Sequence, residues 1–341
     1  MKIGYHTSYW PAQPPQGIPE RLALAEKLGF DSAWSAEAYG SDAFTPLAWW
    51  GAGTSRLKLG TNIVQMAART PAATAMTAIT MDHLTGGRFI LGIGASGPQV
   101  VEGWYGQPYS RPLQRTREYI EIIRRIVARQ EPVTYAGEHH QLPYSGGTGL
   151  GKPLKSTVHP LRDRIPIYLA AQGPKNIALA AEIADGWLPF LYSPKGDEFY
   201  RKSLAEGFAR RPGGPPDGEF EVPVAPTTVF DDDLEAAADT VRPWIALYIG
   251  GMGAKEANFH AASVARLGYE AEVEKVQQLF LAGNKKDAIA AVPTAMVDDL
   301  SLLGSPARIR DRLQLWEQSV ATTLLVAGDE THLRRIVDVV S

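Results

Sequence analysis

Cysteine is absent from this chain of 341 residues, which excludes disulfides, thiolate nucleophiles and cysteine-ligated metals. Other metal sites find little support, because His139 and His140 are adjacent and would face opposite sides of a strand, and no HExxH motif occurs. A GxSxG nucleophile elbow is also missing, which argues against a serine hydrolase. Thiol, hydrolytic and metal chemistry are therefore poorly supported.

Long hydrophobic runs and basic clusters are lacking too. No segment approaches the roughly 18 uninterrupted apolar residues needed to cross a bilayer. The first residues enter a strand without the charged and apolar regions of a signal peptide. The net charge of −3 comes without a basic cluster, which argues against nucleic acid as a partner. We therefore expect a cytoplasmic protein that binds neither a membrane nor nucleic acid.

The stretch 165–190 shows what the chain does contain. A short apolar run, typical of a strand buried on both faces, ends at Gln172, Gly173 and Pro174. Proline suits the first position of a helix, and glycine lets another group approach the backbone closely. A helical pattern follows, and then a second apolar run. Because a helix start offers unpaired N–H groups and partial positive charge, the turn is a candidate anion site as well as an ordinary strand-to-helix loop.

The same type of junction recurs along the chain: an alanine-rich helix end, a Gly or Asp turn and a short apolar strand. The eight predicted strands fall within residues 2–7, 25–34, 54–64, 82–94, 165–171, 182–190, 220–229 and 318–326. Eight strands alternating with helices favour a single (β/α)8 TIM barrel over residues 1–341, in the α/β class. In such a barrel the active site lies at the carboxyl ends of the strands.

Two regions exceed the minimal repeat. Residues 132–164 are rich in Gly, Pro and His, and we interpret them as an ordered insertion over the barrel mouth. Residues 231–297 have a largely helical pattern interrupted by GGMG at 250–253. We interpret this second region as a helical excursion before the last strand, and as a candidate subunit-contact surface.

The sequence G-x-G-x-x-G at 92–97 invites a dinucleotide-binding interpretation, which its position contradicts. A Rossmann fingerprint belongs to the first βαβ unit, whereas this one follows the fourth predicted strand. A Gly-rich nest remains, and together with the turn at Gly173 and Pro174 it could hold one phosphate.

Two polar residues are candidates for catalysis. Glu37 follows the second strand, where a carboxylate could orient a cofactor ring or move a proton; the alternative is a surface Glu near a helix start. His6 ends the first strand and is either a pocket donor or a satisfied core histidine. Trp10, Tyr39 and Trp187 are candidate aromatic walls of a substrate pocket, although most aromatics in a barrel belong to its core.

Five motifs together resemble a known family. They are EAYGSDAFTP (37–46), LGTNIVQMAARTPAATAMTA (59–78), LTGGRFILGIGASGPQVVEGWYGQP (84–108), GTGLGKPLK (147–155) and LAAQGPKNIALAAEIADGWLP (169–189). The chain resembles the bacterial luciferase-like flavin and deazaflavin barrels, and within them it is most similar to the coenzyme F420-dependent oxidoreductases. The resemblance covers nearly the whole chain.

The resemblance implies a site, a cofactor and an assembly. A non-proline cis peptide is expected at Asn62-Ile63, behind the deazaflavin ring. The coenzyme phosphate is expected against Ser96, Gly97, Pro98, Ala171, Gln172, Gly173 and Pro174. Lys152, Lys155 and Lys175 are candidates for binding the glutamate tail of the coenzyme. A homodimer is also implied.

The activity that follows is hydride transfer between C5 of coenzyme F420 and a small organic substrate, since a deazaflavin is confined to two-electron chemistry. One rival is an FMN-dependent monooxygenase, because the same barrel holds FMN elsewhere in the family. A second rival is a non-catalytic binder of a flavin-like ligand.

Overall fold

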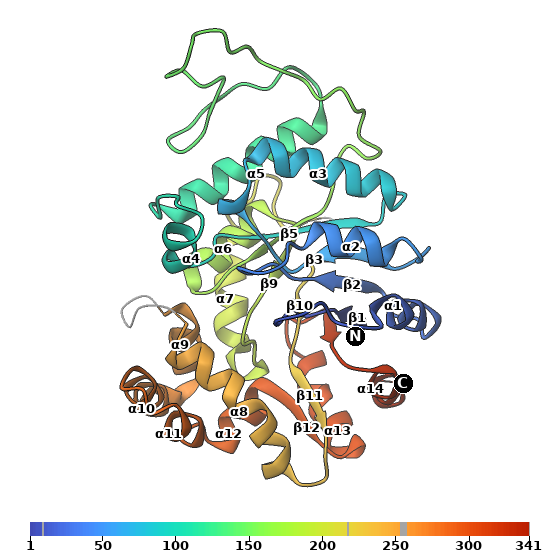
Figure 1. Ribbon diagram of the computed structural model, residues 1–341, viewed down its shortest axis with the longest axis vertical. Coiled ribbons are helices and arrows are strands. Elements are labelled where there is room, and N and C mark those ends of the chain that lie inside the picture. Colours follow the sequence, from blue (N-terminus) through green and yellow to red (C-terminus); the bar gives the residue numbers. More distant parts are fainter. Residues whose placement is uncertain (9, 217, 253–257, 341) are drawn as a thin grey trace.

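Parallel strands form the barrel that the alternating pattern predicts (Figure 1). The computed structural model describes residues 1–8, 10–216, 218–252 and 258–340. Neighbouring strands around the barrel follow the order β10, β13, β1, β2, β3, β5, β8 and β9. Their bounds are β1 (Lys2–His6), β2 (Ser32–Ser35), β3 (Lys58–Thr61), β5 (Phe89–Gly94), β8 (Ile167–Ala170), β9 (Gly186–Leu188), β10 (Pro223–Val224) and β13 (Thr323–Val326).

Backbone hydrogen bonds between β9 and the segment before β10 close this ring. The N–H of Trp187 donates to the carbonyl of Glu221 at 2.8 Å, and Gly186 forms a parallel bridge with Glu221. A further short strand, β4 (Val64–Gln65), pairs with β5 beyond the end of β3. The (β/α)8 prediction is therefore confirmed.

Helices surround the barrel and bury its outer face. They are α1 (Ile18–Lys27), α2 (Phe44–Gly51), α3 (Pro71–Leu84), α4 (Pro98–Gly103), α5 (Pro112–Ala128), α6 (Pro174–Ile183), α7 (Asp197–Phe208), α13 (Pro306–Glu317) and α14 (Glu330–Val340), with the 3-10 turns η1 (Met66–Ala68) and η2 (Pro194–Gly196). Pro174 is the first residue of α6, as the sequence predicts. The main core lies between this helical layer and the strands.

A separate cluster of large side chains fills the barrel interior. It consists of Trp34, Ile90, Tyr168, Leu188 and Leu325, all of them buried. The indole of Trp34 fits because β3 carries Gly60, where a Cβ atom would lie 2.4 Å from the ring. The interior below the mouth is thus packed with side chains, which leaves the strand ends and their loops to form a site.

The predicted strand 220–229 is in fact two strands. β10 pairs with β13 in the barrel, whereas β11 (Thr227–Phe230) pairs with β12 (Ser301–Gly304) in a separate two-stranded sheet. Pro226 lies between them and has no N–H to continue the ladder. The apolar run therefore leaves the barrel halfway along its length.

The helical excursion lies between β11 and β12. Its elements are α8 (Leu234–Gly250), α9 (Phe259–Val264), the π-helical segment η4 (Ala265–Tyr269), α10 (Glu270–Leu281), α11 (Lys285–Ala290) and α12 (Thr294–Leu300). These helices lie together on one side of the barrel (Figure 1, orange). They bury a core of their own. The excursion is helical as expected and extends a few residues beyond the predicted end at 297.

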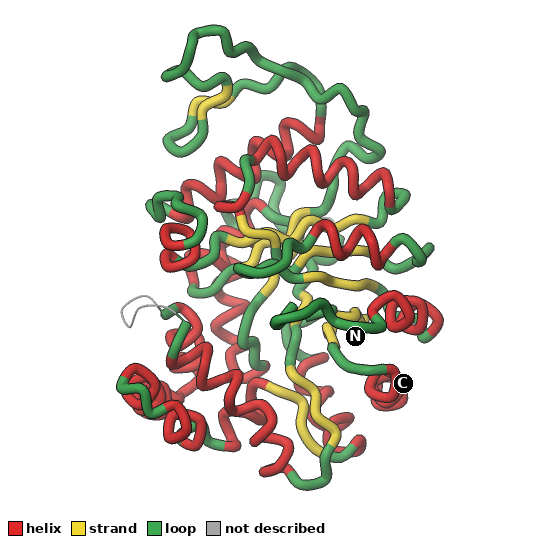
Figure 2. The backbone as a smooth tube through the Cα atoms, viewed as in Figure 1, coloured by secondary structure: helices red, strands yellow, loops and turns green. Residues whose placement is uncertain are grey.

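The insertion 132–164 does not cover the barrel mouth, contrary to the sequence interpretation. It is mostly loop with one small hairpin, β6 (Tyr135–Ala136) and β7 (Gln141–Leu142), and lies beyond α3 and α5 (Figure 2). Arg162 forms an ion pair with Asp82 near the end of α3, and Arg129 after α5 donates to the carbonyl of Ser156. The physical reason is topological: a segment that leaves the end of a helix to enter a strand starts at the amino-terminal face of the barrel.

Candidate functional site

A backbone bulge at the end of β3 lies at the carboxyl-end face of the barrel. The Asn62-Ile63 peptide is cis, as the resemblance predicts. The N–H of Asn62 donates to the carbonyl of Ser35 at 2.6 Å, and the N–H of Glu37 donates to the carbonyl of Ile63 at 3.1 Å. The loop after β2 therefore holds the bulge from both sides.

Glu37 reinforces this arrangement through its side chain. The residue is 6% exposed. Its Oε1 accepts hydrogen bonds from the guanidinium of Arg69 at 2.8 Å and from the N–H of Gln65 at 3.0 Å. Its Oε2 accepts the N–H of Ala43 at 3.4 Å. Both oxygens are thus engaged in contacts that surround the bulge.

Arg69 is the residue of this group that the sequence interpretation missed. It precedes α3 and lies 32 positions from Glu37 along the chain. The only available signal was its place within the motif QMAART, which does not indicate the partner. An ion pair this well shielded depends on both members, since either one alone would leave a charge with poor solvation.

His6 faces the same bulge from the end of β1. Its Nδ1 accepts the N–H of Ser8 at 3.0 Å. Burial lowers the pKa of His6 to about 4, and a hydrogen bond from the ring to the backbone carbonyl of Asn62 offsets only part of this effect. The ring is therefore neutral at neutral pH, with its proton on Nε2 directed at the bulge and a lone pair on Nδ1.

The turns after β5 and β8 lie side by side, because the two strands are neighbours that pair Ile93 with Leu169. Ser96 has a φ of 61° and Gly173 a φ of 78°, both in the left-handed region. Neither α4 nor α6 has a side-chain hydrogen bond capping its first turn. Two helix starts with uncapped first turns therefore converge, which is the arrangement that binds an anion.

The side chains of the second turn make contacts within the protein. Gln172 donates through Nε2 to the carbonyl of Phe190 at 3.0 Å. The carbonyl of Ala171 accepts the indole N–H of Trp187 at 2.9 Å. An anion at this turn would therefore meet backbone N–H groups rather than the Gln172 amide.

The three predicted aromatic walls lie in different places. Trp187 is 1% exposed and packs against Tyr200 of α7 in the core outside the strands, so the structure does not bring it to the mouth. Trp10 follows β1 and packs against Trp50 with ring centroids 5.8 Å apart. Tyr39 follows β2, is 56% exposed and lies against Trp104 after α4. Trp10 and Tyr39 thus remain on loops at the carboxyl ends of the strands.

The predicted lysines are also separated. Lys155 donates through Nζ to the carbonyl of Gln130 just after α5, which places it at the amino-terminal face of the barrel. Lys175 is the second residue of α6 and lies at the barrel mouth.

Within the described residues, no group of three or more His, Asp or Glu side chains could hold a metal ion. No helix in that part of the chain has the length and apolarity to span a membrane.

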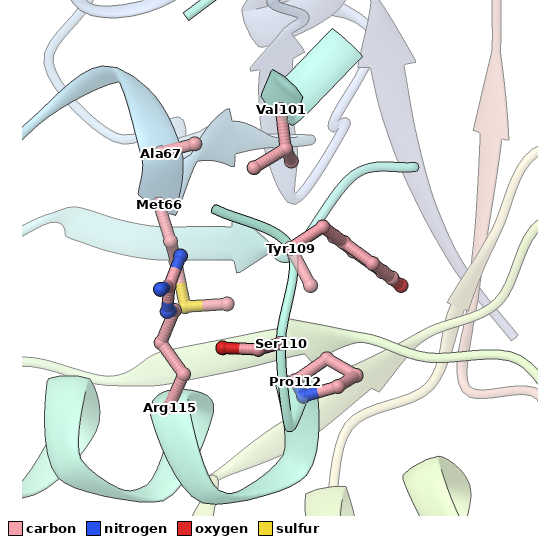
Figure 3. A pocket seen from close by; sticks show the side chains of 8 residues that line it. Met66, Ala67, Val101, Tyr109, Ser110, Pro112 and Arg115 are labelled. Carbon is pink, nitrogen blue, oxygen red and sulfur yellow. The ribbon is translucent and has the colours of Figure 1, made fainter. Parts of the chain in front are cut away.

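A small pocket adjoins the first turn on the side of α5 (Figure 3). Its lining includes Met66 of η1, Ala95 after β5, Val101 of α4, Ser110 in the loop before α5 and Arg115 in the first turn of α5. Met66, Ala95 and Val101 lie within two of the family motifs, but Ser110 and Arg115 lie in none of them, so the sequence did not indicate this pocket.

Comparison with known proteins finds that the chain is similar to luciferase-like monooxygenases and to coenzyme F420-dependent enzymes. A family model described as luciferase-like monooxygenase matches residues 2–323. A Mycobacterium tuberculosis protein, provisionally named a coenzyme F420-dependent oxidoreductase, is 52% identical over 98% of this chain and 97% of its own length. The 5,10-methylenetetrahydromethanopterin reductase of Archaeoglobus fulgidus is 30% identical over 90% of this chain and 87% of its own.

A solved structure supports the fold. The coenzyme F420-dependent tetrahydromethanopterin reductase from Methanopyrus kandleri superposes with a TM-score of 0.75 at 23% identity, covering 99% of this chain and 96% of that one. At this identity the likeness shows that both chains share the barrel.

Proposed function

The chain belongs to the luciferase-like monooxygenase family, and on that basis we propose that it is a coenzyme F420-dependent oxidoreductase that transfers hydride between the deazaflavin C5 and a small organic substrate. One observation carries the proposal: the cis bulge at Asn62-Ile63 leads into β4, which pairs with β5, and β5 pairs with β8, so the strands that end at the turns of Ser96 and Gly173 are neighbours of the bulge. They do so in a chain whose relative at 52% identity is named for this coenzyme.

The residues present fit a phosphate-bearing cofactor. A Cβ atom at Gly173 would meet nothing within 4 Å, so open space adjoins this turn at the start of α6. Ser96, Gly97 and Pro98 would hold the phosphate on one side, and Ala171 to Pro174 would hold it on the other. Backbone N–H groups and the aligned helix dipoles supply the attraction.

The bound coenzyme would supply hydride transfer at C5. The bulge at Asn62-Ile63 would support one face of the ring, and Trp10 and Tyr39 would limit access of water from the loops after β1 and β2. His6 is neutral, and its two nitrogens contact the N–H of Ser8 and the carbonyl of Asn62. Proton transfer between His6 and a substrate oxygen would therefore require one of these two contacts to break.

Glu37 would act on the ring through the bulge. Its two oxygens already accept hydrogen bonds from Arg69, Gln65 and Ala43. Transfer of a proton to or from a substrate would first break one of these contacts. We therefore assign Glu37 a positioning role in this proposal, because its carboxylate also forms an ion pair with Arg69. His6 remains the candidate for proton transfer, because each of its nitrogens makes only one contact.

The proposal includes a cytoplasmic homodimer, whose contact surface we place on α2 and α3 and not on the helical excursion at 231–297. Large apolar side chains are exposed on neighbouring helices α2 and α3, namely Trp49, Met76 and Leu84. Apolar side chains exposed on adjacent helices are typical of a surface that a partner covers. Sedimentation of the purified protein tests the oligomeric state.

Cofactor capture tests the function. The protein is incubated separately with coenzyme F420, FMN and NADPH, desalted and examined by absorbance. Retention of F420, followed by its reduction or oxidation with an alcohol or carbonyl substrate, is the expected result. Oxygen consumption with reduced FMN would support a monooxygenase instead. Retention of F420 without turnover over a broad substrate panel would support a non-catalytic binder.

A further inference from the structure

The pocket beside the first turn contains a cationic group without an anionic partner. We call it the α5 pocket and define it by Met66, Ala95, Val101, Ser110 and Arg115. Figure 3 shows the guanidinium of Arg115 next to Met66, with the Ser110 hydroxyl directed toward the same space.

The guanidinium of Arg115 is held in place but is not satisfied. Its Nη1 donates to the carbonyl of Pro108 at 2.7 Å. Its Nε is buried and has no hydrogen-bond partner, and no carboxylate pairs with Arg115 among the described residues. Arg115 is partly exposed, but its Nε–H is buried and unpaired. Such a group favours a bound carboxylate or phosphate, because a charge-assisted hydrogen bond would replace the hydration that the buried N–H has lost.

The position of the α5 pocket relates this cation to the phosphate turn. Ala95 lines the pocket and directly precedes Ser96 and Gly97. A ligand whose phosphate occupies the turn would therefore have its adjoining atoms within reach of Arg115. In coenzyme F420 the atoms beyond the phosphate lead to a chain of glutamates, so carboxylates are the groups that would arrive there.

We infer that the α5 pocket binds a carboxylate of the glutamate tail, with Arg115 as its ligand and Ser110 as a second donor. The inference rests on the proposed function and deepens it, because it specifies where the tail leaves the phosphate site. It also replaces Lys155 as a tail contact, since that lysine lies at the opposite face of the barrel.

Titration with coenzyme forms that differ only in the tail tests this inference. The probes are F420 without glutamate and F420 with several glutamates, and binding is followed by fluorescence quenching. The wild-type protein is expected to bind the tailed form about tenfold more tightly, the effect of one partly exposed charge-assisted hydrogen bond. Arg115→Gln should reduce this preference to about twofold or less and leave binding of the tail-free form unchanged.

Two further variants make the result specific. Ser110→Asp adds a negative charge to the pocket without removing Arg115, and it should also remove the preference for the tailed form. Arg125→Gln is the matched control, because it neutralises an exposed arginine farther along α5 and should keep the preference. Thermal unfolding confirms that each variant is folded.

The possible failures are distinguishable. If the wild-type protein binds neither form, the proposed function is wrong. If it binds both forms equally, the function stands and the tail site is wrong. Equal weakening of both forms by Arg115→Gln in a folded protein would also overturn the inference, because Arg115 would then act on the phosphate or on the pocket as a whole.

Discussion

At the scale of single residues, the contacts of Glu37 limit what its carboxylate can do. Position alone allowed it to be an acid, a base or a support for a ring. The structure adds that Arg69 and two backbone N–H groups occupy both oxygens. Because those donors come from two segments next to the bulge, at residue 43 and at residues 65–69, loss of the charge would disturb the geometry against which a ring would rest.

Replacement of Glu37 by Gln tests this role. Turnover is expected to fall by about 10²-fold, because a ring support displaced by about 1 Å misaligns the reacting atoms, while the Kd of the coenzyme changes by less than about threefold. Unpaired Arg69 should also reduce the free energy of unfolding by about 2 kcal/mol. Single-turnover rates, fluorescence titration and denaturant unfolding measure the three quantities.

Glu26→Gln is the matched control. Glu26 also uses its carboxylate to accept several N–H groups, from Ser55, Arg56 and Leu57, but it lies away from the mouth. It should lose stability without a comparable loss of turnover. Wild-type turnover in Glu37→Gln would show that the residue is merely structural.

The lowered pKa values of two histidines predict how the free energy of unfolding depends on pH. Burial lowers the pKa of His6 and of His260 to about 4, below the value of 6.5 expected in the unfolded chain. Between these values the unfolded chain binds more protons, so the free energy of unfolding falls as the pH decreases from 6.5 toward 4. Each histidine should contribute about 2 kcal/mol to the loss between pH 7 and pH 5.

Denaturant unfolding of His6→Asn and His260→Asn at the two pH values measures these contributions. Each variant should lose less stability on acidification than the wild type, and the double variant should lose the least. An unchanged pH dependence in both variants would contradict the assignment of neutral buried rings.

At the scale of elements, the strand, turn and helix at 165–183 show why local signals were reliable here. An apolar strand, a glycine with positive φ and a proline at the first helical position agree with one another, and α6 begins at Pro174 as predicted. The position of the insertion after α5 was predicted wrongly, because the length of the segment does not show at which face of the barrel it begins. A helix-to-strand connection starts at the amino-terminal face, whatever its composition.

Substitution in the turn at Gly173 should weaken coenzyme binding more than substitution in the turn at Ser96. Gly173→Val is expected to weaken coenzyme binding at least tenfold, because a branched residue resists a φ of 78° and occupies the space next to the anion. Ser96→Ala should weaken binding severalfold at most, since it removes at most one neutral hydrogen bond of about 1 kcal/mol.

Gly213→Val controls for backbone strain alone. Gly213 has a φ of 86° in a surface turn, so this variant should lose stability and keep its affinity for the coenzyme. Equal, small losses of affinity in Gly173→Val and Ser96→Ala would place the anion elsewhere.

Disturbing the insertion 132–164 should leave coenzyme binding and turnover at the barrel mouth unchanged. Glu118 of α5 is buried and accepts the N–H groups of Glu138, His139 and His140. Glu118→Ala leaves these donors unpaired and should raise hydrogen exchange across residues 132–164. Coenzyme affinity and turnover should remain within twofold of the wild type. A large loss of either would show that the insertion contributes to the site after all.

At the scale of the whole molecule, the sequence predicted what depends on repetition and missed what depends on pairing across distance. Alternating strands and helices indicated the barrel, and five motifs indicated the family. The pair Glu37 and Arg69 could not be inferred, because nothing local joins residues on different loops. Trp187 was predicted wrongly because the sequence does not show which side of β9 faces inward: Leu188 faces the barrel interior, and successive side chains alternate, so Trp187 faces the helices.

A crystal structure of the protein with coenzyme F420 would locate the cofactor in the barrel mouth. We expect the deazaflavin ring against Asn62-Ile63 and the phosphate between Ser96–Pro98 and Gly173–Pro174. Coenzyme bound away from both turns, or a mouth that takes up FMN and excludes F420 under the same conditions, would contradict this expectation.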